Sequence, residues 1–283
     1  YLSDGTEVAA NVPRFEQGKF GKAVLVEEGT TNLISKAFYG PFLQYTYMGT
    51  GTQLSFLNNA GIGGSGVRRA VKGNNMTESY ISAAQSIAGS FTTGQTYTFS
   101  VYARASGSSV IGKTLQLAYY DGATLRNSAV GTLTDQWQRY SYTFTFQRNA
   151  TQINIYVCVA HSSVNIGEGF DVCLPQLEAK PYATSFIDGT RATETLTIPT
   201  AGVLDENEFD IAGWFIPAIS SSIAPRFARI WALKNVPLTG LYNNDGTIRF
   251  AWNNKEVINT GISLNANDLL FYSVSKSGSN VTI

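Results

Sequence analysis

The strongest constraint on the fold is the alternation of apolar and polar residues in short segments separated by glycine-containing turns. The clearest examples are Thr96–Ala103, Thr114–Tyr119, Arg139–Phe146, Gln152–Val159 and Phe170–Leu174. Strict alternation places one set of side chains on each face of a strand, so it predicts half-buried β-strands. The best helix candidate, Glu78–Ser86, allows only a few turns. The pattern therefore predicts an all-β fold made of antiparallel β-sandwiches or jelly rolls.

Residues 191–283 repeat this pattern with different spacing, which predicts a second all-β unit. The expected strands are Thr195–Pro199, Phe209–Pro217, Arg229–Leu233, Thr247–Trp252 and Leu269–Ser275. Asn243-Asn244-Asp245-Gly246 has the composition of a hairpin turn. A length of 283 residues suits about two domains, each with its own core. Because the chain begins with Tyr1 and ends on a strand-like alternation, we expect it to be part of a longer protein, cut at both ends.

Composition limits the chemistry that the chain can perform. It has 20 basic and 20 acidic side chains, one histidine and two cysteines. A multi-histidine zinc site is impossible, a Ser-His-Asp triad would have to use His161, and two cysteines cannot supply a four-thiolate metal cluster. Zero net charge argues against a nucleic-acid partner, and no apolar run approaches the ~18 residues of a membrane-spanning helix. A carboxylate pair remains as the enzymatic route.

Three motifs outside the central strands resemble the concanavalin A/laminin-G-like sandwiches. They are Gly18–Val24, Leu196–Pro199 and Glu208–Phe215. In that family the first two motifs usually lie within a few dozen residues of each other, whereas here residues 25–195 separate them. The resemblance therefore implies that one β-domain is inserted into an early loop of another, with the two ends of the insertion close together.

The inserted segment resembles a carbohydrate-binding-module jelly roll. The resemblance rests on Thr31–Ile34, Thr96–Arg104, Trp137–Tyr140 and Phe170–Glu178. It implies two nested antiparallel sandwiches. The outer one would comprise residues 1–30 and 179–283, truncated at its C-terminal end, and the jelly roll would comprise residues 31–178.

The two junctions, Val26–Leu33 and Gln176–Gly189, are similar to those of bacteriophage virion proteins. This likeness implies a non-enzymatic head fibre, spike or tail component, exposed on the virion and oligomeric. Its expected partners are other virion proteins and a cell-surface glycan of a bacterial host. The alternative is a carbohydrate-binding segment of a secreted multidomain enzyme that acts on glycosides.

Strand parity predicts which residues would bind a glycan. Sugars present flat C–H surfaces to aromatic rings and paired hydroxyls to planar polar groups. If the strands share one sheet, the following outward residues would line one surface: Tyr102, Arg104, Gln116, Tyr120, Asn154 and Tyr156. The alternative is that these tyrosines pack against cross-strand neighbours or cover a subunit contact.

The jelly-roll resemblance also implies a structural calcium with Asp171 as a ligand, and no other cofactor is expected. Calcium prefers ~6–8 oxygen ligands, and Phe38-Tyr39 occupies the stretch where the family usually has an acidic residue. The alternative is an exposed aspartate beside a turn. Cys158 and Cys173 share a strand parity, which allows either a cross-strand disulfide or, as we expect for a protein assembled in cytoplasm, two free thiols.

Two further motifs have simple structural explanations. Glu206, Glu208 and Asp210 alternate, as do the catalytic acids of some concanavalin A-like glucanases, but they lie at the turn into a strand and their order differs. Gly61–Gly66 spells G-x-G-x-x-G, yet no helix pattern with an acidic partner follows it. We expect an acidic turn and a loop, respectively.

Overall fold

The computed structural model of the protein describes residues 2, 6–9, 12–18, 21–34, 51–196, 208–217, 238–244, 247–252, 255–278 and 280–282. Within these residues the regular elements are antiparallel strands and two short 3-10 turns, which confirms the predicted fold class. The chain divides into two compact units, Tyr1–Leu196 and Thr197–Ile283. Among the described residues no helix has the length and apolar character required to cross a bilayer.

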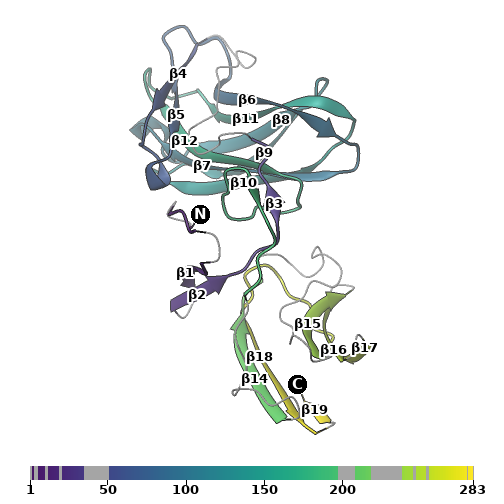
Figure 1. The fold of residues 1–283 in the computed structure, drawn as a ribbon. Coiled ribbons are helices and arrows are strands. Elements are labelled where there is room, and N and C mark those ends of the chain that lie inside the picture. The colour runs from purple at the N-terminus through teal and green to yellow at the C-terminus, as the bar shows by residue number, and fades with distance from the viewer. Residues whose placement is uncertain are drawn as a thin grey trace. The chain divides into compact units, whose positions relative to one another are not determined.

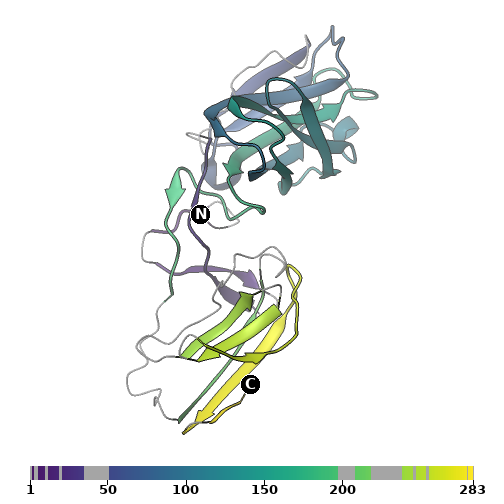
Figure 2. The same ribbon diagram turned by 90° about the vertical axis from the view of Figure 1, so that its right-hand side faces the viewer.

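The jelly roll of the first unit consists of two packed sheets (Figures 1 and 2). One sheet has the order β10-β7-β12-β5-β4 and the other the order β6-β11-β8-β9. The strands are β4 (Thr52–Leu57), β5 (Val67–Lys72), β6 (Tyr80–Phe91), β7 (Thr96–Ala105), β8 (Thr114–Tyr120), β9 (Leu125–Thr132), β10 (Gln138–Thr145), β11 (Ala150–Ala160) and β12 (Gly169–Glu178). The 3-10 turns are Ile62–Gly64 and Ser108–Val110.

The core of the jelly roll lies between the two sheets. The predicted inward residues of β7 and β11 are buried there, and Phe99, Val101, Ile155 and Val157 are each 0% exposed. Aromatic rings from β8 and β10 stack within the core, with the ring centroids of Tyr119 and Phe144 4.1 Å apart. Each such side chain contributes about 1.5–3 kcal/mol when it is fully buried. Alternation therefore predicted the core side of these strands correctly.

The helix candidate Glu78–Ser86 is wrong, because this segment opens strand β6. Its small residues favour a helix in isolation, but β6 pairs with β11 from Tyr80 to Phe91. This pairing buries Ile81 and Ala83 in the core. Tertiary pairing overrides the weak local propensity.

The segments that lead into and out of the jelly roll lie side by side. β3 (Thr30–Thr31) pairs with β13 (Thr190–Arg191) in an antiparallel ladder. Beyond the ladder, the amide of Asn32 donates to the carbonyl of Gly189 at 2.8 Å. The first unit also holds the hairpin of β1 (Arg14–Gly18) and β2 (Gly21–Leu25), so its contacts group residues 1–30 with the jelly roll. The nested division into 1–30 with 179–283 and 31–178 stays a prediction.

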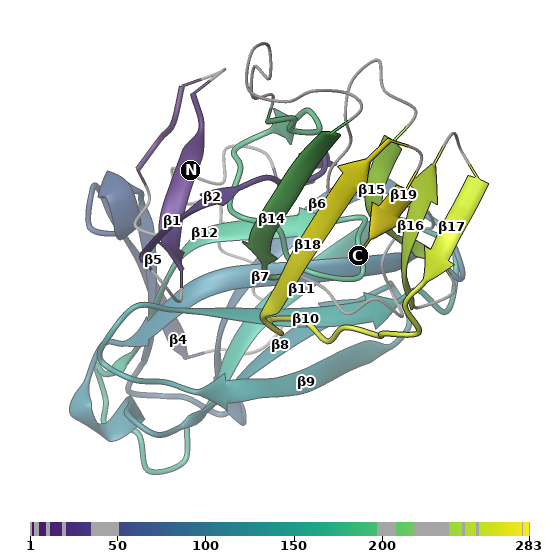
Figure 3. The same cartoon turned by 90° about the horizontal axis from the view of Figure 1, so that it is seen from below.

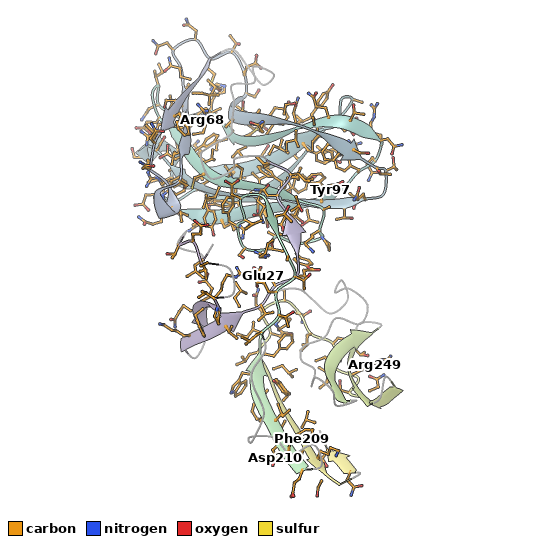
Figure 4. All side chains as sticks on the ribbon, viewed as in Figure 1. Glu27, Arg68, Tyr97, Phe209, Asp210 and Arg249 are labelled. Atoms are coloured by element: carbon orange, nitrogen blue, oxygen red, sulfur yellow. The ribbon has the colours of Figure 1, made fainter. Side chains whose placement is uncertain are left out.

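A half-buried ion network lies beside this ladder, at the Glu27 labelled in Figure 4. Arg14 forms ion pairs with Glu27 and Glu194, each at 2.6 Å, and Arg191 lies 3.2 Å from Glu27. Ser185 donates to Glu27 through both its amide and its hydroxyl. Burial alone would raise the pKa of Glu27, but these hydrogen bonds and Arg191 lower it below the ordinary value of 4.5. The network joins residues that lie far apart in sequence.

The second unit contains two small antiparallel sheets (Figure 3). The first is β14 (Glu208–Phe215), β18 (Leu270–Ser277) and β19 (Asn280–Thr282), and the second is β15 (Leu238–Asn244), β16 (Thr247–Trp252) and β17 (Lys255–Asn259). The strands predicted near Phe209–Pro217, Thr247–Trp252 and Leu269–Ser275 are present. Thr195 and Leu196 are not in a strand. The remaining predictions, Arg229–Leu233, residues 197–199 and the turn at Asp245-Gly246, lie outside the described residues.

Candidate ligand-binding face of the jelly roll

The predicted glycan-binding residues fall on two different sheets. Gln116 and Tyr120 on β8 and Asn154 and Tyr156 on β11 belong to the sheet β6-β11-β8-β9. Tyr102, like Arg104, lies on β7 in the other sheet. The condition that these strands share a sheet is therefore not met, and the structure brings only the first four residues together.

The outer face of the sheet β6-β11-β8-β9 is called the β11 face below. In its strand register Asn154 lies opposite Tyr120, and Tyr156 lies opposite Ala118. The residues of this face are Ser82, Ala84 and Ser86 of β6, Gln116, Ala118 and Tyr120 of β8, Leu125, Asn127 and Ala129 of β9, and Asn154, Tyr156 and Cys158 of β11. The face thus combines tyrosines, amides and hydroxyls with small residues.

Tyr156 forms the floor of the β11 face. Its side chain is only 1% exposed and packs with Ala84, Ala118 and Cys158. The two alanines leave room for the ring between the neighbouring strands. Tyr156 therefore cannot present its ring to a ligand, and the accessible tyrosine among the predicted residues of this face is the half-buried Tyr120.

Asn154 carries an unusual buried acceptor. Its Nδ2 donates to the hydroxyl of Tyr156 at 3.4 Å, whereas its Oδ1 is buried and has no hydrogen-bond partner. An unsatisfied buried polar atom costs about 1–3 kcal/mol. Tyr120, the last residue of β8, lies opposite Asn154 in the strand register.

The two cysteines are free and lie on different sheets. Cys158 is on β11 and Cys173 is on β12, so they are not cross-strand neighbours. Burial raises the pKa of the Cys158 thiol to about 12 and that of Cys173 to about 11. Neither thiol has the low pKa of a reactive cysteine. The expectation of two free thiols is confirmed.

The outer face of the other sheet, called the β12 face below, is closed by other segments of the chain. Its members include Tyr102, Arg104, Ser100, Thr98, Arg139, Asp171, Gln176 and Glu178. The carboxylate of Glu178 accepts hydrogen bonds from the hydroxyls of Thr30, at 2.7 Å, and Thr184, at 2.6 Å. Because both donors come from the junction segments, the chain itself covers the part of this face around Glu178.

The side chains of Tyr102 and Arg104 contact other residues of the β12 face. The Arg139 guanidinium lies 5.7 Å from the ring centroid of Tyr102. The Arg104 guanidinium lies over the Trp137 ring at 4.5 Å and forms an ion pair with Asp171 at 3.2 Å. These contacts hold both side chains against their own sheet.

Asp171 does not fit a calcium site. The carboxylate is 0% exposed, and Arg69 binds both of its oxygens, at 2.7 and 2.9 Å. With Arg104 as a third contact, two guanidinium groups occupy the position that a cation would need. Asp171 is also not the exposed aspartate of the alternative explanation. Across the described residues no group of three or more His, Cys, Asp or Glu side chains is placed to hold a metal.

The remaining motifs provide no second site. Glu208 and Asp210 point outward from β14 and are exposed, and Glu206 lies outside the described residues. The Gly61–Gly66 loop closes on itself through the amide of Gly61 and the carbonyl of Ser65, at 2.9 Å. A Cβ at Gly61 would meet the Cβ of Cys173 at 3.1 Å, so this loop packs onto the β12 face.

A cavity of about 500 Å³ at one end of the β11 face was not predicted from the sequence. It is lined by Ser90, Phe91, Thr92, Asp121, Gly122, Arg148, Asn149, Ala150, Thr151 and Gln152. These residues come from the end of β6, the β8–β9 turn and the start of β11. Loops carry no alternation, so strand parity gives no signal for such a cavity.

Residues 57–163, from the end of β4 to the loop after β11, match the model of a family described as "Carbohydrate binding domain". No curated protein sequence matches the chain. Among solved structures, it is similar to a xylan-binding domain from carbohydrate-binding-module family 22, with 22% identity over 53% of this chain and 99% of that one, at a TM-score of 0.36.

Two other solved structures show weaker sequence identity. One is TmCBM61 in complex with β-1,4-galactotriose, with 12% identity, coverage of 52% and 97%, and a TM-score of 0.37. The other is the enzymatically active domain of tailspike protein 4 from bacteriophage CBA120, with 12% identity and a TM-score of 0.37. The match covers 52% of this chain and 21% of that one, about a fifth of its length. Within the jelly roll, residues 57–163 are therefore similar in sequence to a carbohydrate-binding domain.

Proposed function

We propose that the jelly roll binds a glycan through the β11 face. The observation that carries this proposal is that the β11 face, within the matched residues 57–163, brings together the half-buried Tyr120 and Gln116 and the exposed Asn127. Tyr120 supplies an aromatic surface for the C–H face of a sugar, and Gln116 and Asn127 supply amides for paired hydroxyls. These residues lie on neighbouring strands of one rigid sheet.

The chain acts in this proposal as a non-enzymatic virion structural protein, a head fibre, spike or tail component of a bacteriophage. The junction segments Val26–Leu33 and Gln176–Gly189 support it, because their sequences resemble those of such proteins. The glycan would be on the surface of a bacterial host. A small, partly polar face binds a single sugar chain weakly, and a homo-oligomer would gain avidity by presenting several copies.

The second candidate is a carbohydrate-binding segment of a secreted enzyme that acts on glycosides. The same family match over residues 57–163 supports it. The residues that flank this chain in the whole protein distinguish the two candidates. Coiled-coil or collagen-like repeats would favour the fibre, and a catalytic domain would favour the enzyme.

The test is a glycan array probed with an oligomeric form of the full chain, so that weak binding is retained. Tyr120→Ala should weaken binding to the recognised glycan at least about tenfold, since stacking and its hydrogen bonds are worth over ~1.4 kcal/mol. Tyr102→Ala on the β12 face is the matched control and should bind like the wild type. Loss of binding in Tyr102→Ala alone would contradict the assignment of the glycan site to the β11 face. Absence of binding to any glycan would contradict the proposed function.

A further inference from the structure

The cavity at the end of the β11 face adjoins the residues of the proposed glycan site. Gln152 and Asn154 alternate on β11 and share its outer side, and Asp121 directly follows Tyr120. A sugar chain lying along the face would therefore extend from Tyr120 and Asn154 to the cavity. Its volume of about 500 Å³ lies within the range of small-ligand sites.

Asp121, the carboxylate that lines this cavity, is fully engaged inside its own turn. Its Oδ1 accepts the amides of Ala123, at 3.1 Å, and Thr124, at 2.9 Å, and its Oδ2 forms an ion pair with Arg126 at 2.8 Å. Although burial raises the pKa of Asp121, these partners lower it below its ordinary value. Asp121 is charged, and Arg126 balances that charge.

Arg148 is the cationic side chain that lines the cavity. It is exposed, and it makes no hydrogen bond or ion pair with any residue that the structure describes. The Oδ1 of the neighbouring Asn149 accepts hydrogen bonds from the amide of Thr93, at 2.8 Å, and from its hydroxyl, at 3.2 Å. The Nδ2 of Asn149 is therefore the group of this amide that remains to donate to a ligand. Because both oxygens of Asp121 are already bonded, the positive charge of Arg148 is the charge in the cavity lining that no described residue balances.

We propose that this cavity binds the carboxylate of an acidic sugar, such as a uronate residue, through the guanidinium of Arg148. A guanidinium binds a carboxylate with two parallel hydrogen bonds, a geometry that a neutral hydroxymethyl group cannot reproduce. Asn149, Gln152 and the hydroxyls of Ser90, Thr92 and Thr151 surround the charge with groups that suit sugar hydroxyls. The inference rests on the proposed function and names the class of its ligand, an acidic glycan.

The test uses the full chain and glycans in matched pairs, oligogalacturonates and other uronate-containing oligosaccharides beside their carboxyl-reduced forms. At low ionic strength the acidic form of the recognised backbone should bind about tenfold more tightly than the reduced form. Arg148→Gln should abolish this preference and leave binding of the reduced form unchanged. Arg148→Lys should keep part of it, since the charge remains without the planar fork.

Lys22→Gln is the matched control, because it removes the same charge from an exposed position on β2. It should preserve the preference for the acidic form. Equal binding of acidic and reduced forms, or a preference that survives in Arg148→Gln, would overturn the inference and leave the proposed glycan function intact. Failure to bind any glycan would instead overturn the proposed function. Competition by acetate alone, at the concentration at which the oligosaccharide competes, would show a site for small anions and would also overturn the inference.

Discussion

The two outer faces of the jelly roll differ although both come from the same alternating pattern. On the β12 face the outward carboxylates Asp171 and Glu178 are each 0% exposed and are fully hydrogen-bonded by other parts of the chain. On the β11 face Asn154 retains a buried Oδ1 without a partner, and Tyr120 stays half-buried. The carboxylates of the β12 face are bound by other segments of the chain, and the β11 face is the one that we propose binds a ligand. A side chain that points away from the core of the jelly roll is therefore not always exposed to solvent. The two faces differ in whether their polar groups are hydrogen-bonded within the chain.

The largest effect that would test this comparison is expected at Glu178. Glu178→Ala leaves the hydroxyl of Thr30 and both the amide and hydroxyl of Thr184 without their acceptor. We expect a loss of about 3–5 kcal/mol in the free energy of unfolding, because buried donors left unpaired are costly. Urea denaturation measures it. Gln116→Ala on the β11 face is the control and should cost less than about 1 kcal/mol. An equal cost at both positions would contradict the distinction between the faces.

Within the β11 face, substitution of the buried Tyr156 should lower the free energy of unfolding much more than substitution of the proposed ligand-binding residue Tyr120. Tyr156→Ala removes a side chain that is 1% exposed and should cost about 3 kcal/mol by leaving a cavity. Tyr120→Ala removes a half-buried ring and should cost less than about 1 kcal/mol. Thermal unfolding of both variants checks the stabilities. A large loss of stability in Tyr120→Ala would make it a structural residue and would weaken its use as evidence for binding.

A smaller, pH-dependent effect is expected at the ion network of the junction. The pKa of Glu27 is lower in the folded chain than its ordinary value of 4.5. Its contribution is therefore complete above the unfolded pKa and disappears as the pH falls through the folded one. Glu27→Gln should cost about 1–3 kcal/mol near neutral pH and less in acid, because the charge-assisted hydrogen bonds are lost. Denaturation of both forms across pH 2–7 measures the difference, and a constant difference would contradict this role.

The smallest effect concerns the thiols, one on each face. With pKa values raised to about 12 for Cys158 and about 11 for Cys173, both should react slowly with a disulfide reagent near pH 8 and rapidly after denaturation. Labelling of Cys158→Ser and Cys173→Ser assigns the rates. If Cys158 reacts quickly in the folded chain, its thiol is accessible to solvent, which would contradict the close packing of Tyr156 against Cys158.

The sequence predicted five strands of the jelly roll, β7, β8, β10, β11 and β12, and the core side of β7 and β11, because alternation encodes both. It did not predict β4, β5 or β9, and it gave the start of β6 as a helix candidate. It could not predict which strands share a sheet, because the alternation within a strand does not depend on which strand it pairs with. Tyr102 and Tyr156 therefore have equal outward parity, yet they lie on different sheets. The pairing of Asp171 with Arg69 depends on the ladder between β12 and β5, whose residues are 102 positions apart. The cavity beside Arg148 depends on loops that meet only in the folded chain.

The short ladder between β3 and β13 has a mechanical consequence. Because Thr31 pairs with Thr190, a pulling force applied at the two ends of the chain passes across this ladder and the neighbouring Arg14–Glu194 and Arg191–Glu27 ion pairs. The intervening residues 32–189 form a closed loop that bears no tension while the ladder holds. Tension applied at the two ends of the chain therefore reaches the jelly roll only after the ladder between β3 and β13 has opened.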